Sequence, residues 1–89
     1  MSVLSLQITY RKGKPFAAYL YLSHAPGIKS ARTEQVTPEL VIDYAADGSP
    51  LGIEIVSPGF VTAEEINKVF DRLGLSRPSS SELAPLIAA

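Results

Sequence analysis

The sequence predicts a small α+β domain, a mostly antiparallel sheet of about five strands with one C-terminal helix packed on one face. The strands would form two hairpins plus an edge strand. Apolar and polar residues alternate over residues 4–10 and 40–56, as they do in half-buried strands. The Asp47-Gly48 pair is a hairpin signal, and residues 62–74 carry a helical pattern. The domain is expected over residues 1–75, followed by a Pro/Ser-rich C-terminal tail over residues 76–89.

The first hairpin is expected from the two strand patterns that flank the polar turn RKGKP. The strand before the turn alternates, so one of its faces is buried. The strand after it, FAAYLYLS, is apolar on both faces, with aliphatic side chains on one and Tyr19 and Tyr21 on the other. Residues 31–37 are polar and precede a proline, which predicts a weak third strand at an edge of the sheet.

The second hairpin is expected to turn at Asp47-Gly48. A two-residue type I′ turn needs positive φ at both central residues, a conformation that Asp and Gly tolerate. That turn pairs apolar side chains across the strands, Leu40 with Ile55, Ile42 with Ile53 and Tyr44 with Leu51. A three-residue bulged loop would shift the pairing by one residue and set Ile42 against Gly52, so the pattern favours the tight turn.

The helix has clear start and stop signals. Thr62 and Glu65 match a capping box, and Gly74 fits the left-handed residue just past a helix end. Apolar residues share one helical face, namely Ile66, Val69, Phe70 and Leu73. Beyond the helix, Pro78 and three consecutive serines indicate a linker, and the final LAPLIAA is apolar without helical length.

Composition limits the classes of function. The chain has 89 residues, a net charge of −1 and no cysteine. The near-neutral charge argues against a nucleic-acid partner, and the lack of cysteine excludes disulfides, thiolate metal sites and a cysteine nucleophile. No apolar run approaches the roughly 20 residues of a membrane span, and the first residues lack the pattern of a signal peptide. A cytoplasmic protein without a membrane partner is therefore expected.

Few residues invite a chemical role. His24 is the only histidine and lies in a Pro/Gly loop, and no nucleophile elbow or phosphate loop is present. No catalytic, metal-binding or cofactor residues are expected, and the chain is not expected to be an enzyme. Asp43 and Glu54 fall on the wetter face of the second hairpin, where solvated carboxylates are ordinary. The alternative is a small ligand or divalent cation held between subunits by these two carboxylates, although hard cations usually take six or more oxygens.

Over about residues 5–56 the chain resembles the bacterial domain-of-unknown-function family 2283. The motifs that carry the resemblance are Asp43-Tyr44, Asp47-Gly48 and the closing Gly-Ile-Glu-Ile at 52–55, with the strands at 8–10 and 18–22. The resemblance implies a small antiparallel sheet in a soluble bacterial protein. Some members lie beside genes for small toxins, which implies an antitoxin role. Members commonly carry Asp after the first-strand Tyr, where this chain has Arg11.

The tyrosines suggest an interaction face. If the helix covers the aliphatic side of the sheet, Tyr19 and Tyr21 point the other way, with Val41 and Val56 beside them. Tyrosine suits interfaces because its ring buries area and its hydroxyl finds partners. The expected function is a non-catalytic protein-interaction module that forms a homo-oligomer, with a dimer favoured, or that binds a small protein partner such as a toxin. The alternative is that the C-terminal tail or a loop covers this face. A further alternative for the tail is that its Ala-Ala end acts as a degradation signal.

Overall fold

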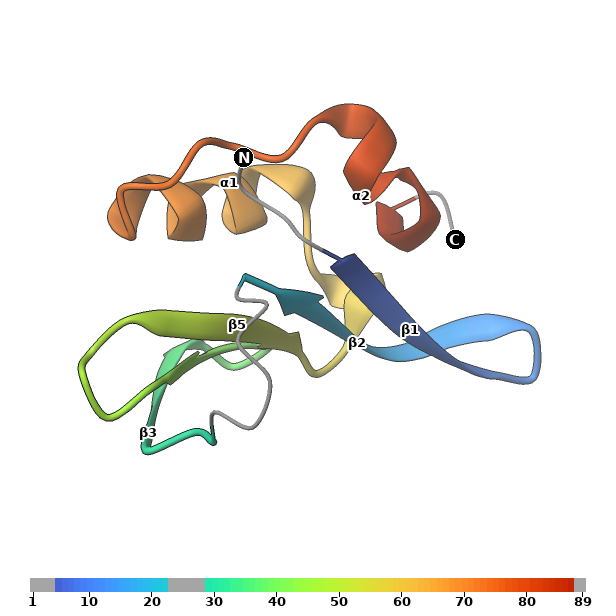
Figure 1. Cartoon of the computed structure of the whole chain (residues 1–89). Coiled ribbons are helices and arrows are strands. Elements are labelled where there is room, and N and C mark those ends of the chain that lie inside the picture. Colours follow the sequence, from blue (N-terminus) through green and yellow to red (C-terminus); the bar gives the residue numbers. More distant parts are fainter. Residues whose placement is uncertain (1–4, 23–28, 88–89) are drawn as a thin grey trace.

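The computed structural model describes residues 5–22 and 29–87 (Figure 1). His24 and the beginning of the first predicted strand lie outside these residues. The elements, in chain order, are the strands β1 (Ser5–Arg11), β2 (Lys14–Tyr21), β3 (Arg32–Thr37), β4 (Leu40–Tyr44) and β5 (Pro50–Ile55), the 3₁₀ turn η1 (Pro58–Phe60), and the helices α1 (Ala63–Arg72) and α2 (Ser80–Ile87).

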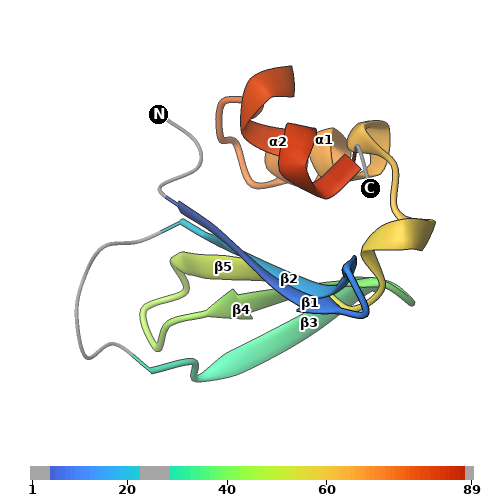
Figure 2. The same cartoon turned by 90° about the vertical axis from the view of Figure 1, so that its right-hand side faces the viewer.

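The five strands form one antiparallel sheet in the order β1-β2-β5-β4-β3. Both helices lie on the same side of this sheet, so the molecule has two layers (Figures 1 and 2). The polar strand β3 lies at one edge, as its composition indicated. The predicted α+β class, with two hairpins plus an edge strand, is confirmed.

The core lies between the inner face of the sheet and the helices. The buried side chains of β2, β4 and β5 alternate along their strands and therefore share the helix-covered face. The core consists of Ala18, Leu20, Leu40, Ile42, Tyr44, Ile53 and Ile55 from the sheet, together with Val61, Ile66, Val69, Phe70, Leu83 and Leu86. Phe70 is the largest fully buried side chain of the core.

The β4–β5 turn differs from the predicted two-residue type. Ala45 N–H donates to the Ser49 carbonyl at 2.8 Å, and Gly48 N–H donates to the Ala45 carbonyl at 2.9 Å. The loop therefore has three residues, and within it Gly48 has a φ of 90° while Asp47 has no positive φ. Asp47 instead accepts hydrogen bonds from the backbone N–H and the hydroxyl of Ser49, at 2.9 and 2.7 Å.

A second irregularity restores the expected core pairing. Tyr44 pairs with Pro50, not with Leu51, and the register then shifts before Asp43 pairs with Gly52. This bulge absorbs the extra residue of the loop. The predicted pairs Ile42–Ile53 and Leu40–Ile55 are thus present, although the turn that was expected to enforce them is not.

Helix α1 has the predicted ends. The Thr62 hydroxyl accepts from Glu65 N–H at 3.2 Å, and Thr62 N–H donates to the Glu65 carboxylate at 3.0 Å, which completes the capping box. After the helix, Gly74 adopts a φ of 72° and Leu75 N–H donates to the Phe70 carbonyl.

Helix α2 was not expected from the sequence, which indicated a Pro/Ser-rich tail. Its start is a capping box in which Glu82 N–H donates to the Ser79 hydroxyl at 3.1 Å and Ser79 N–H donates to the Glu82 carboxylate at 2.7 Å. Leu83 and Leu86 are buried in the core, one helical turn apart. Pro85, which lacks an N–H, lies inside the helix and argues against helix when the sequence alone is considered.

We expect Leu86→Ala to lower the free energy of unfolding by about 2–5 kcal/mol, because it removes a buried side chain and leaves a cavity. Urea denaturation of the full chain measures this change. The control is Ala84→Ser at an exposed position of the same helix, which should stay within about 0.5 kcal/mol of the wild type. A Leu86→Ala curve that overlays the control would show that α2 does not support the core.

Candidate functional site

The face of the sheet away from the helices is the candidate site. Directly paired residues share a face, so the pairings define this surface, which we call the outer face. It consists of Gln7, Thr9, Ala17, Tyr19, Tyr21, Thr33, Gln35, Val41, Asp43, Gly52 and Glu54. Neither of the described helices covers it (Figure 2).

Tyr19 reaches across the sheet to Asp43. Its hydroxyl donates to the Asp43 carboxylate at 2.8 Å, although β5 lies between the strands that carry the two residues. The ring crosses β5 over Gly52, where a Cβ would lie only 2.3 Å from a ring carbon of Tyr19. Only a residue without a side chain permits this crossing, so Gly52 positions Tyr19.

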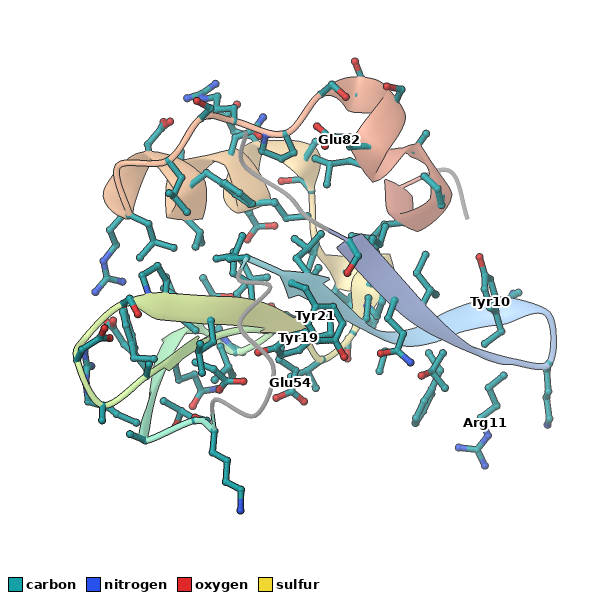
Figure 3. All side chains as sticks on the ribbon, in the orientation of Figure 1. Tyr10, Arg11, Tyr19, Tyr21, Glu54 and Glu82 are labelled. Carbon is teal, nitrogen blue, oxygen red and sulfur yellow. The ribbon has the colours of Figure 1, made fainter. Side chains whose placement is uncertain are left out.

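Tyr21 is held on the other side of the same cluster. Its hydroxyl donates to the Gln7 side-chain oxygen at 2.9 Å. The rings of Tyr19 and Tyr21 meet edge to face, with centroids 4.6 Å apart and an interplanar angle of 61° (Figure 3). Tyr19 is half-buried, whereas Tyr21 keeps 38% of its surface exposed.

Burial and the Asp43 carboxylate both favour the neutral form of Tyr19. Burial is the larger cause that raises the pKa of the Tyr19 hydroxyl above its ordinary value of 10.0. The hydrogen bond to Asp43 and then its negative charge raise this pKa further, with smaller effects from Tyr21 and Glu54. Tyr19 is therefore a hydrogen-bond donor at neutral pH.

The other predicted site residues surround this cluster. Glu54 pairs with both Tyr19 and Val41, is exposed, and lines an open hollow of about 230 Å³ with Gln7 and Thr9. Val41 is partly buried, and Val56, just past the end of β5, is 43% exposed. Three of the four residues of the predicted interaction face, Tyr19, Tyr21 and Val41, thus lie on the outer face.

The predicted alternative pair does not gain a third ligand. Asp43 and Glu54 lie on the same face, but Asp43 is already bonded to Tyr19. Within the described residues, no group of three or more His, Cys, Asp or Glu side chains could hold a metal ion. The sequence did not reveal the roles of Gln7 and Gly52, because both depend on which strands become neighbours.

A second polar cluster lies on the inner side of β3 and connects the sheet to α1. Arg72 donates to Glu34, which also accepts from the Tyr44 hydroxyl at 2.9 Å. The hydrogen bond from Arg72 is the main cause that lowers the pKa of Glu34, followed by the bond from Tyr44. Arg32 stacks 4.0 Å from the Tyr44 ring centroid. These groups tie β3 and α1 together and do not contribute to the outer face.

The fold and the outer face define a small α+β protein in which both helices of the described residues cover the same side of the sheet. Residues 17–57 match the family model described as "Protein of unknown function (DUF2283)", in agreement with the resemblance that the sequence predicted. The match runs from β2 to just past β5 and includes Tyr19, Tyr21 and Asp43. No curated protein and no solved structure gave a match. No helix in the described part of the chain is long and apolar enough to cross a membrane.

The raised pKa of Tyr19 predicts a dependence of stability on alkaline pH. The neutral hydroxyl is favoured in the folded state, so its contribution is complete below the unfolded-state pKa of about 10 and is lost as pH rises above it. We expect the free energy of unfolding of the wild type to fall more steeply above pH ~10 than that of Tyr19→Phe. At pH ~7, Tyr19→Phe should cost about 0.5–1.5 kcal/mol through the lost hydrogen bond.

Urea denaturation at a series of pH values measures both effects. Tyr10→Phe, an exposed tyrosine of β1, is the control and should keep the wild-type slope. Parallel pH dependences for the wild type and Tyr19→Phe would contradict the role assigned to the Tyr19 hydroxyl.

Proposed function

We propose that this protein is a non-catalytic interaction module that self-associates through the outer face of its sheet. The observation that carries the proposal is the one-sided covering of the sheet. Both helices pack on the inner face, while the outer face presents Tyr19 and Tyr21 to the surroundings (Figure 3). A sheet with a second face of this kind gains stability when another surface covers it.

Hydrogen bonds within the sheet hold both tyrosines in place. The bonds of Tyr19 to Asp43 and of Tyr21 to Gln7 fix both rings before any partner arrives. Binding therefore orders few side chains, which lowers its entropic cost. The exposed ring of Tyr21 offers apolar area at low conformational cost.

The rest of the outer face combines apolar and polar side chains, as association surfaces do. Val41, which pairs with Glu54, and Val56, just past the end of β5, add apolar area. Thr33 and Gln35 supply polar groups on the edge strand β3, and Glu54 lies between Tyr19 and Val41. A mixture of aromatic, apolar and polar groups is usual for a non-obligate interface.

These residues support binding better than catalysis. A general acid or base works best with a pKa near the operating pH, and the pKa of Tyr19 moves away from neutrality. The Asp43 carboxylate is occupied by Tyr19. We therefore propose no reaction for this site.

Self-association predicts a specific defect for Tyr21→Glu. The new carboxylate would be desolvated in the interface without a partner, so we expect the dimer to dissociate at least about tenfold more readily. Light scattering coupled to size-exclusion chromatography over a concentration series measures this change.

The matched control is Phe60→Glu, which places the same carboxylate at an exposed aromatic residue of η1, outside both the outer face and the β1–β2 hairpin. It should assemble like the wild type. A wild type that stays monomeric at every concentration would refute the proposal, as would a Tyr21→Glu variant that assembles normally.

A small toxin is the partner that the family resemblance suggests, and we propose that it would compete for the same face. Co-expression with the product of the adjacent gene should give a complex that co-purifies, and Tyr21→Glu should weaken it at least about tenfold. Absence of a complex with the wild type would remove the antitoxin role and leave self-association untouched.

A further inference from the structure

The tip of the β1–β2 hairpin extends beyond the rest of the sheet. β2 pairs with β1 from Lys14 to Tyr21, but it pairs with β5 only from Ala18 to Tyr21. The first half of β2 therefore has no strand neighbour on its β5 side, and the hairpin projects from the body (Figure 1). Its backbone reverses at Lys12 and Gly13, both with positive φ, which is a tight two-residue turn.

This projecting tip is basic and aromatic. Arg11, Lys12 and Lys14 are exposed, and the Arg11 guanidinium lies 5.3 Å from the ring centroid of Phe16, which is 51% exposed. The salt bridges among residues 5–22 and 29–87 join Arg72 to Glu34 and Arg77 to Asp71, so none of them uses these cations. Arg11 points away from the helices, to the same side as Glu54 (Figure 3).

The opposite end of the same face is acidic. Glu54 is exposed, and Asp43 lies two residue pairs further from the tip. Lys14 pairs with Arg11 at the tip, and Tyr19, five residues later in β2, pairs with Glu54. At a rise of about 3.3 Å per residue, the basic and acidic ends are roughly 17 Å apart along the strands.

We propose that two copies pack outer face to outer face about a two-fold axis, with the basic hairpin of each over Glu54 of the other. The inference rests on the proposed self-association and specifies its orientation. A two-fold arrangement that reverses the strands brings each basic end over the acidic end of the partner, so both contacts form at once. The small side chains of Thr9 and Ala17 lie between the two ends and leave room for close approach of the sheets.

The charge pattern favours a second copy over a polyanion. A nucleic acid would be attracted by the tip but repelled by Glu54 and Asp43 on the same face. A second copy offers the complement of both ends, and opposite charges placed in this way fix the orientation of a complex.

A charge exchange in the full chain tests the orientation. We expect Arg11→Glu and Glu54→Arg each to raise the dissociation constant of the dimer about tenfold or more, because each places like charges together. The double variant, Arg11→Glu with Glu54→Arg, should restore the constant to within about threefold of wild type, since the pair reforms with reversed signs. Wild-type dissociation should also increase when salt rises from about 0.05 to 0.5 M.

Analytical ultracentrifugation measures the constants, and circular dichroism checks that each variant is folded. Lys68→Glu, a charge reversal at an exposed position of α1, is the control and should leave the dimer unchanged. If a dimer forms but the single variants and salt leave it unchanged, the orientation is wrong while self-association stands. If single variants weaken the dimer and the double variant does not recover, the pairing of Arg11 with Glu54 is wrong. A monomeric wild type overturns both proposals.

Discussion

The register between β4 and β5 determines both faces of the sheet. When Ile42 pairs with Ile53 and Leu40 with Ile55, the aliphatic side chains all point to the helices. The same register places Gly52 beside Asp43 on the outer face. Because β2 pairs with β5, the ring of Tyr19 can cross the bare backbone of Gly52 and bond Asp43. A slip of one residue would expose the core and also remove the tyrosine cluster, so stability and the candidate site depend on one constraint.

The sequence predicted that register for a reason that was only partly correct. The apolar alternation required Ile42 to face Ile53, and the core enforces it. The turn type was inferred from the pattern as well, on the assumption that no other irregularity intervened. In the structure, Asp47 bonds Ser49 and Gly48 takes the left-handed position of a three-residue loop, and a bulge beside Tyr44 then corrects the pairing. Burial of the core side chains outweighs the local preference for an uninterrupted hairpin.

Helix α2 and the tyrosine cluster illustrate two further limits of the sequence. The Ser79–Glu82 capping box and the spacing of Leu83 and Leu86 are local signals of a helix, but Pro85 and the serine run obscure them. Eight residues would be marginal as an isolated helix, so packing of its leucines on the core stabilises α2. The face of the two tyrosines was predictable from alternation alone. Their hydrogen bonds to Asp43 and Gln7 were not, because they depend on strand order, which local pattern does not specify.

The difference between the two faces of the sheet is the basis of the proposed self-association. Both helices are needed to close the inner face, which leaves none of the described elements to cover the outer one. That face avoids indiscriminate contact because its tyrosine hydroxyls are bonded and its margins are polar. Polar margins still allow binding, but only of a partner whose own groups complement them. The outer face has cations at one end and carboxylates at the other, so it is complementary to a second copy of itself that is turned end for end. Two-fold pairing is therefore the simplest way to cover it.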